Sequence, residues 1–480
     1  MLEGLEISEV MLSETKTDNE KFRLDDEFFQ KGYLKAYSDI KSKPSSKVGE
    51  VIDILTDYHA NGSYENLNNH VKILDQEDYA YMIRSTDLEK RDFQNDVKYV
   101  SRSAYEFLSK TKLYGGEILI NKIGSPGRVY LMPSLDKPAT LGMNLFMIRL
   151  KKDSTFNEKF VWAFFHSSLG QKIIYRKVNG TVPLTIDKEA VKSLYLPKLS
   201  KKFQDFIGTS VEKSECCLKE SKITYNKAES LLLKSLGLEN FSPSGKNTNI
   251  KSFKNSFSTT GRLDAEYYQP KYEDYQNHVF SYQEGWSPLE KVCDLKDKNY
   301  SPNDEKFYQY IELADINKSG GITGCSKELG KDLPSRARRK VNAGDVLIPS
   351  IEGSLSSCAI VSKEFENSLC STGFYVIKSD KINSETLLVL FKSDLMQNIL
   401  KQSCSGTILT AINKDEFLKI PLPLIDPKTQ SQISLLIQES FSLKSKSEKL
   451  LELAKKAVEM AIEESEEKAM KFINQQFYSN

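Results

Sequence analysis

Arginine and lysine side chains gather in the stretch Lys331–Lys340, where Asp332 is the single acidic residue. The guanidinium group of arginine forms paired hydrogen bonds with phosphate oxygens and with the edge of guanine. The stretch precedes Gly344–Ile348, a turn glycine and acid followed by branched apolar residues, which predicts a turn and then a strand. We therefore expect a loop here that contacts DNA. The residues that carry this prediction are Lys331, Arg336, Arg338, Arg339 and Lys340.

The segment Lys98–Lys112 occupies the corresponding place in the first half of the chain and interleaves basic residues with aromatic ones. Basic groups favour phosphate contacts, and aromatic faces can lie against sugars or bases. We expect this segment to be a second DNA-contacting loop. Its candidate residues are Lys98, Tyr99, Arg102, Lys110 and Lys112.

A loop with glycine and serine follows the next predicted strand in each half. Asn121–Arg128 comes after Gly116–Ile120, and Pro349–Ser356 comes after Gly344–Ile348. Glycine and serine allow a backbone to approach a ligand closely. These loops are predicted to join the basic segments in contacting DNA, and their candidate residues are Lys122, Arg128, Ser350 and Ser354.

No motif for catalysis accompanies these candidates. The patterns GxxxxGK[ST], GxGxxG, HExxH and GxSxG are missing, as is the Asn/Asp-Pro-Pro-aromatic tetrapeptide of adenine methyltransferases. The four histidines are scattered. Asp187–Glu189 could form a nuclease-type acidic cluster, but a helix N-cap at Asp187 and at its counterpart Asn413 explains both sites. We expect no catalytic residue, no metal and no cofactor.

The elements that must position these residues occur twice. Phe165–Leu199 aligns without a gap with Phe391–Ile425, and 11 of the 35 positions are identical. An opening phrase, Arg23–Phe29, is repeated at Arg262–Tyr268. A repeat of this length is a duplicated domain rather than a solenoid unit. The repeated helices and strands agree, whereas the basic segments differ, which favours two readers of two different short DNA sequences.

Helical periodicity follows each globular half. Apolar residues at spacings of three and four predict one long helix over about Gln204–Leu236 and another over about Thr429–Gln476. The polar segment Phe241–Ser258 is predicted to be a linker. A bare helix as polar as the first is marginal on its own, so we expect the two helices to pair.

Composition sets the remaining bounds. The net charge of +1 gives no overall attraction to nucleic acid, so local patches must supply it. The seven cysteines show no CxxC spacing and are expected to be reduced thiols in a cytoplasmic protein. No run of 18 apolar residues is present, so no membrane span is expected.

The order of short motifs resembles a specificity subunit of a Type I restriction–modification system. The motifs are the two opening phrases, Tyr310–Ile322, Gly344–Ile348, the paired blocks Asn179–Lys188 and Ser405–Lys414, and the Leu-Pro strand before each long helix. The resemblance implies an α+β fold with two tandem mixed α/β target-recognition domains, joined by two long antiparallel helices that form a coiled coil with pseudo-twofold symmetry.

Domain boundaries follow from the repeat and from this resemblance. We expect target-recognition domains at 1–200 and 261–426, spacer helices at 201–240 and 427–480, and a linker at 241–260. The resemblance further implies a non-catalytic subunit that binds double-stranded DNA. Each domain would read one half of a bipartite site, while the helices dock adenine methyltransferase subunits and, through them, the motor–nuclease subunit, in a system of phage defence. The second helix, with its acidic run Glu463–Glu467, extends beyond the length of the first, so the docking surfaces need not be fully symmetric.

Two other classes of function remain open from the sequence. A self-sufficient restriction or modification enzyme would need the catalytic motifs that are missing here. A coiled-coil scaffold that binds proteins would show no sequence-selective binding of duplex DNA.

Overall fold

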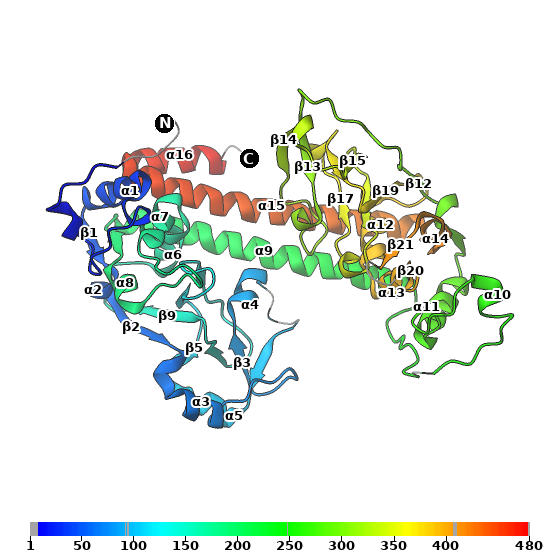
Figure 1. Cartoon of the computed structure of the whole chain (residues 1–480), viewed down its shortest axis with the longest axis horizontal. Coiled ribbons are helices and arrows are strands. Elements are labelled where there is room, and N and C mark those ends of the chain that lie inside the picture. Colours follow the sequence, from blue (N-terminus) through cyan, green and yellow to red (C-terminus); the bar gives the residue numbers. More distant parts are fainter. Residues whose placement is uncertain (1–7, 92, 94–95, 247, 407–409, 479–480) are drawn as a thin grey trace. The chain divides into compact units, whose positions relative to one another are not determined.

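The computed structural model describes residues 8–91, 93, 96–246, 248–406 and 410–478. The chain divides into two compact units, which are described separately (Figure 1). Unit 1 contains residues Met1–Cys216 and Lys446–Asn480, and unit 2 contains Cys217–Ser445. Residues 407–409, which belong to the second of the paired sequence blocks, lie outside the described residues.

Unit 1 is built on two four-stranded sheets. The first is antiparallel throughout and has the order β2-β9-β6-β7, with β2 Ile52–Asp57, β9 Leu145–Leu150, β6 Ile118–Asn121 and β7 Val129–Leu131. The second has the order β4-β3-β8-β5, with β4 Lys98–Val100, β3 Ala80–Ile83, β8 Ala139–Leu141 and β5 Lys112–Leu113. Strands β3 and β8 are parallel, and the other pairs of this sheet are antiparallel.

Unit 2 repeats this topology. Its antiparallel sheet has the order β12-β19-β16-β17, with β12 Asp294–Leu295, β19 Phe374–Lys378, β16 Val346–Pro349 and β17 Ala359–Ile360. Its mixed sheet has the order β14-β13-β18-β15, with β14 Ser326–Leu329, β13 Phe307–Ile311, β18 Leu369–Ser371 and β15 Ala337–Lys340. Strands β13 and β18 form its parallel pair. The predicted α+β fold with a duplicated mixed α/β domain is confirmed.

Each predicted Leu-Pro strand forms a two-stranded ribbon: β10 (Tyr195–Pro197) pairs with β1 (Ser45–Lys47), and β22 (Pro421–Pro423) pairs with β11 (Trp286–Pro288). Shorter helices surround the sheets. In unit 1 they are α1 Lys31–Lys41, α2 Val48–Val51, α3 Tyr64–His70, α4 Ser85–Lys90, α5 Arg102–Phe107 and α8 Lys188–Ser193. In unit 2 they are α10 Phe257–Thr260, α11 Pro270–Phe280 and α14 Lys414–Lys419, with the small ribbon β20 Cys404–Ser405 and β21 Ala411–Ile412.

The repeated sequence block encodes a bent helix pair, α6 (Glu158–His166) with α7 (Ser168–Arg176) in unit 1. Ser167 lies at the bend, where its hydroxyl donates to the carbonyl of Phe164 (2.6 Å) and accepts from the amide of Gly170 (3.0 Å). Gln171 fixes the same bend by donating its Nε2 to the carbonyl of Phe165 (2.5 Å). Because an N-cap serine satisfies an otherwise unpaired amide, these side chains specify where one helix ends and the next begins.

Unit 2 has the same bend between α12 (Ser384–Lys392) and α13 (Asp394–Gln402). Ser393 donates to the carbonyl of Leu390 (2.6 Å), and Gln397 donates to that of Phe391 (2.6 Å). The predicted N-caps are also confirmed, since Asp187 accepts from the amide of Ala190 (2.8 Å) and Asn413 from that of Glu416 (2.9 Å).

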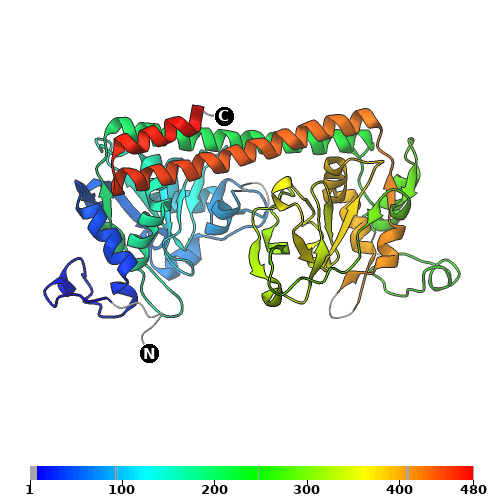
Figure 2. The same cartoon turned by 90° about the horizontal axis from the view of Figure 1, so that it is seen from above.

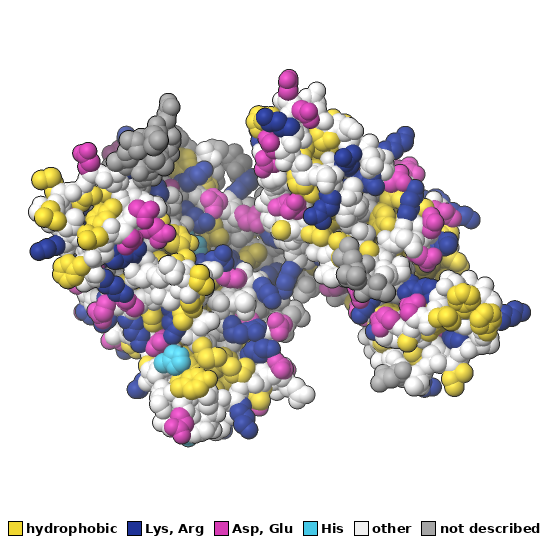
Figure 3. Space-filling view, viewed as in Figure 1, with side chains coloured by type: hydrophobic (Ala, Val, Ile, Leu, Met, Phe, Trp, Pro, Cys, Tyr) yellow, Lys and Arg dark blue, Asp and Glu magenta, His cyan; other side chains and the backbone are white. Residues whose placement is uncertain are grey.

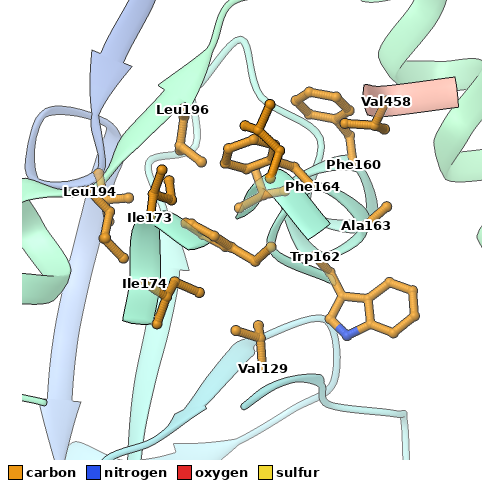
Figure 4. Packing of buried hydrophobic residues seen from close by; sticks show 14 of the residues in the cluster. Val129, Phe160, Trp162, Ala163, Phe164, Ile173, Ile174, Leu194, Leu196 and Val458 are labelled. Carbon is orange, nitrogen blue, oxygen red and sulfur yellow. The ribbon is translucent and has the colours of Figure 1, made fainter. Parts of the chain in front are cut away.

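The core of unit 1 forms where α6 and α7 pack between the antiparallel sheet and the last turns of the chain. Phe160 and Phe164 on α6 and Ile173 on α7 are fully buried, and Val129 of β7 closes the cluster from the sheet side (Figure 4). Val458 reaches the same cluster from the long C-terminal helix (Figure 4). Apolar burial of this extent is the main favourable contribution to folding.

The long helices are α9 (Lys201–Ser235) and α15 (Pro427–Glu463). Within each unit the two run side by side, and Figures 1 and 2 both show this. In unit 1, Ser214 Oγ lies 2.8 Å from Ser447 Oγ. In unit 2, Ser221 Oγ lies 3.1 Å from Ser440 Oγ. The two serines on each helix are one heptad apart. The earlier serine of α9 faces the later serine of α15, so the pairing is antiparallel as predicted.

The second long helix is not continuous to Gln476, and that prediction was wrong. It ends at Glu463, and a separate helix, α16 (Glu466–Tyr478), begins after Ser465. The Ser465 hydroxyl accepts from the amide of Lys468 (3.2 Å), as an N-cap does. The acidic run therefore surrounds a helix break, and α16 turns Ala469 and Ile473 into the core of unit 1. Among the described residues, no helix is long and apolar enough to cross a membrane.

Candidate nucleic-acid interface

The segment Lys98–Lys112 is not a loop, which corrects the prediction from sequence. It contains β4, α5 and the start of β5, and it belongs to the mixed sheet of unit 1. The alternation of aromatic and basic residues that suggested a loop comes from a short strand and a one-and-a-half-turn helix joined at Ser101, which caps α5. The candidate residues are therefore held on rigid elements.

Most basic candidates of unit 1 already have an acidic partner. Lys98 pairs with Asp75, and Lys112 Nζ lies 2.6 Å from the carboxylate of Glu106. Arg128 Nη1 lies 2.8 Å from that of Glu89, and this hydrogen bond raises the pKa of the guanidinium. Exposed ion pairs of this kind are weak, so a phosphate can displace the carboxylate. Tyr99 is buried against Tyr81, with their ring centroids 5.3 Å apart.

Two candidates of unit 1 lack a carboxylate partner among the described residues. Arg102 is exposed and lies over the ring of Tyr79, 5.6 Å from its centroid. Lys110 is exposed and donates to the carbonyl of Ala60 (2.9 Å). These two side chains keep their full charge toward solvent.

Lys122 lies in a buried ion cluster rather than on the surface. Its Nζ is 2.8 Å from the carboxylate of Asp57, whose other oxygen accepts from Lys188 at 2.8 Å. Burial by itself would raise the pKa of Asp57, but the two ammonium groups outweigh it and the pKa lies below the usual range. The cluster fastens the start of α8 to the end of β2, and it borders a surface hollow formed with Ile123 and Phe146.

Unit 2 retains one arm of this cluster. Asp297 lies just after β12 and pairs with Lys414 at the start of α14. Lys188 and Lys414 are identical positions of the sequence repeat. The sequence reasoning treated this block only as a helix cap and missed the pairing. Its detectable signal was a lysine kept in both copies beside a cap that had changed from aspartate to asparagine.

The segment Lys331–Lys340 was also predicted as a loop, and this too is corrected. Its last four residues form β15, an edge strand of the mixed sheet. Arg336, Arg338 and Lys340 are exposed and have no carboxylate partner among the described residues, and neither has the exposed Lys331. Arg338 donates only to the carbonyl of Ser335 (2.8 Å). The pairing of β15 with β18 shifts register between Ala337 and Arg339, and a bulge of this kind redirects side chains at the edge of a sheet.

Arg339 differs from its neighbours because it points inward. Its guanidinium donates to the carbonyl of Asp297 and to the side chain of Asn299 (2.5 Å). The two serine candidates also make internal contacts. Ser350 donates to the carbonyl of Gly373 (3.0 Å) and Ser354 to that of Ile351 (3.0 Å). The side chains of Arg339, Ser350 and Ser354 therefore stabilise the fold beneath the surface, and their polar groups are already bonded within unit 2.

The two units therefore share a scaffold and differ in surface charge. The basic candidates of unit 1 are largely matched by carboxylates, whereas those on β15 of unit 2 are not. On the face seen in Figure 3, basic and acidic side chains are interspersed rather than gathered by sign. Among the described residues, no three His, Cys, Asp or Glu side chains are placed to hold a metal ion.

Comparison with known proteins gives the class to which this scaffold belongs. Residues 283–453 match the family model described as the Type I restriction modification DNA specificity domain. No curated protein matches the chain.

Two solved structures match the chain over most of its length at low similarity. One is the Type-I restriction-modification system S subunit from M. genitalium, with 13% identity, 88% of this chain and 95% of that chain covered, and a TM-score of 0.44. Another is the HsdS subunit from Thermoanaerobacter tengcongensis, with 14% identity, coverage of 88% and 97%, and a TM-score of 0.27.

The family match spans most of the mixed and antiparallel sheets of unit 2, and unit 1 has the same strand order. Residues 283–453 thus match a DNA specificity domain of Type I restriction–modification systems, as the resemblance predicted. The match supports DNA recognition as the role of this part of the chain.

Proposed function

We propose that each unit reads one half of a bipartite DNA site. The observation that carries this proposal is the pair of identical sheet topologies bearing unlike basic surfaces. In unit 1 the reading surface includes Arg102 and Lys110, with Lys98, Lys112 and Arg128 recruited when phosphates replace their carboxylates. In unit 2 it is centred on β15. Phosphate contacts fix the register of a protein on DNA, and unlike side chains then select unlike bases.

The finer partners are proposed in the same way. Adenine methyltransferase subunits dock on the chain, and the motor–nuclease subunit joins through them, in the cytoplasm where the DNA lies. Two like docking sites require surface features that the duplication has kept. The repeated opening phrase supplies one such feature in each unit.

In unit 1 this feature is an arginine clamp. Arg23 forms two hydrogen bonds with the Asp25 carboxylate, at 2.7 and 2.6 Å. Its Nη1 also donates to the carbonyl of Val178 (2.5 Å), just after α7. Leu24, between the clamped residues, is 78% exposed. The backbone is thus held while the leucine side chain faces solvent.

Unit 2 repeats the clamp. Arg262 forms two hydrogen bonds with Asp264, at 2.8 and 2.6 Å, and donates to the carbonyl of Cys404 (2.8 Å). Leu263 is 74% exposed. A single exposed leucine is ordinary, but the same leucine held by the same arginine contacts in both units favours a shared partner surface. We propose that Leu24 and Leu263 each contact one methyltransferase subunit.

The recognition proposal is tested by mapping methylated adenines in cells that carry the complete system. Replacing Arg336 and Arg338 with alanine should relax base selection in one half-site and leave the other unchanged. Arg339 is kept in this variant because it supports the fold from inside. Equivalent replacement of Arg102 and Lys110 should relax the opposite half-site. A methylation pattern that is unchanged in both variants, or changed in the same half-site by both, contradicts the proposal.

A further inference from the structure

A basic, aromatic cavity lies over β13 in unit 2, apart from the exposed arginines of β15. It encloses about 490 Å³, and none of its lining residues is acidic. Volumes of this order are typical of pockets for small organic groups, about 300–1,000 Å³. Its lining residues are Tyr300, Lys306, Phe307, Tyr308, Gln309, Lys327, Lys340, Asn367 and Leu369.

Three lysines of the cavity share one arrangement, each with its ammonium group near an aromatic ring. Lys306 Nζ lies 5.8 Å from the ring centroid of Tyr308, and Lys340 Nζ lies 5.8 Å from that of Tyr300. Lys327 Nζ lies 5.9 Å from the Phe307 ring. All three lysines are exposed, and none has a carboxylate partner in the part of the chain that the structure describes. An ammonium held over a ring keeps its N–H groups available to a second ligand.

The walls of the cavity are fixed by contacts of their own. The hydroxyls of Tyr300 and Tyr308 lie 3.2 Å apart, and the Tyr308 hydroxyl accepts from the amide of Asn303 (3.0 Å). Tyr308 is 8% exposed and packs on Leu369, whereas Phe307 at the rim is 58% exposed. The acidic residue of the neighbouring strand β14 is Glu328, which pairs with Tyr308 in the ladder and does not line the cavity.

In the corresponding sheet of unit 1, the lysines near aromatic rings are neutralised by carboxylates. Lys137 Nζ lies 5.8 Å from the ring of Tyr99, but this lysine pairs with Glu77. Lys98 on the same sheet pairs with Asp75. The excess positive charge is therefore found in unit 2, and it does not follow from the sheet topology that the two units share.

We propose that this cavity is a backbone clamp that binds a phosphodiester group of DNA, with the adjoining sugar against the Phe307 and Tyr308 rings. Three uncompensated ammonium groups match the oxygens of a phosphate, and aromatic faces match its organic neighbours. This inference rests on the proposed function, because it assumes that unit 2 meets DNA. It adds that this cavity contributes sequence-independent affinity, while Arg336 and Arg338 select bases.

The test measures how strongly the binding of the full-length chain to a random-sequence duplex depends on salt. Each phosphate that the protein neutralises adds about 0.9 to the slope of log affinity against log salt concentration. Replacing Lys306, Lys327 and Lys340 together with glutamine removes the neutralisation of one phosphate, so it should lower that slope by about one. Phe307→Leu should weaken binding and leave the slope unchanged. A triple variant with the unaltered slope overturns the clamp.

A matched control removes the same charge from other elements of unit 2. Lys271→Gln, Lys401→Gln and Lys419→Gln together give the same net charge, and the slope should stay at the unaltered value. An equal fall in both triple variants shows a general effect of charge and also overturns the clamp. A free mononucleotide that occupies the cavity but leaves the salt dependence of DNA binding unchanged would also overturn the clamp.

The outcome for the clamp can be separated from the outcome for recognition. Loss of the clamp should weaken binding equally for all sequences and preserve the methylated motif in both half-sites. An unaltered chain that shows no salt-dependent binding to duplex DNA, alone or with its methyltransferase, counts against the proposed function itself.

Discussion

At the scale of single residues, the chain separates charges that face solvent from charges that hold the fold. Lys122 and Arg339 look like surface cations in the sequence, yet both bond inward. Arg102 and Arg336 look the same and remain exposed. The difference depends on which carboxylates and carbonyls the fold brings near, and residue type alone does not reveal it.

The ion cluster of Asp57 should contribute to the stability of unit 1. Lys122→Met removes one of two ammonium groups and leaves a largely buried carboxylate only partly compensated. We expect the free energy of unfolding to fall by about 1–3 kcal/mol. Urea denaturation checks this, with Lys192→Met as the control because that lysine is exposed and pairs only with Glu189 on its own helix. Equal stability of the two variants would show that the cluster contributes nothing.

His166 should make unit 1 sensitive to mild acid. Burial lowers its pKa to about 4, and its Nδ1 contacts the carbonyl of Trp162 at 3.2 Å. The unfolded chain takes up a proton near pH 6.5 and the folded chain does not, so stability falls as pH drops from about 6.5 to 4. His166→Gln should remove about 1–3 kcal/mol of that loss. Chemical denaturation at several pH values tests this, and the exposed His70→Gln should retain the full dependence.

At the scale of elements, a buried glutamine joins each long helix to its own domain. Gln204 accepts from the amide of Asn157, the N-cap of α6, at 3.0 Å and donates to the carbonyl of Leu199 at 2.9 Å. Gln430 makes the same contacts with Asn383 (2.9 Å) and Ile425 (2.8 Å). The angle at which each helix leaves its domain is therefore specified twice by the same chemistry.

Replacing one of these glutamines with leucine should weaken the contact between the long helix and its domain without leaving a cavity. Gln204→Leu keeps the volume but leaves a buried N–H and a buried carbonyl unpaired, which costs about 1–3 kcal/mol. Gln430→Leu should cost at least as much, because the Gln430 Nε2 also donates to the carbonyl of Lys381 (3.0 Å). The free energy of unfolding measures both effects. The control, Gln438→Leu, replaces an exposed glutamine of α15. If Gln204→Leu or Gln430→Leu is as stable as this control, the buried glutamine does not stabilise the contact between helix and domain.

Much of this element structure could be predicted from the sequence, and the failures have physical causes. Periodicity located α9 to within three residues at its start, because a long amphipathic stripe is a strong signal. The repeat indicated that both copies share the same structure here, but it did not predict the bend between α6 and α7. Strand β15 was mistaken for a loop because an edge strand does not need alternating apolar residues when one face meets solvent. The break before α16 depends on Ser465 amid acidic residues, a local cap that the longer helical pattern obscured.

At the scale of the whole molecule, the duplication continues into the long helices. The 226-residue separation that relates the repeated blocks also relates Ser214 to Ser440 and Ser221 to Ser447. Ser214 bonds to Ser447, and Ser221 bonds to Ser440. The repeat therefore relates the serine pair of unit 1 to the serine pair of unit 2. All four serines are buried, and each unit also has a serine hydroxyl donating to the facing helix backbone. Small side chains here allow the close approach that larger ones would prevent.

If the helices set the distance between half-sites, lengthening both should lengthen the DNA spacer. Inserting one heptad into α9 between Ser214 and Ser221, and one into α15 between Ser440 and Ser447, preserves the facing of every apolar position. Seven residues at 1.5 Å each add about 10 Å, which is about three base pairs of duplex. Methylome mapping should then show both half-sites unchanged in sequence and a spacer longer by about three base pairs. A heptad in α9 alone breaks the pairing and should abolish modification. An unchanged spacer in the double insertion would show that something other than these helices determines the gap.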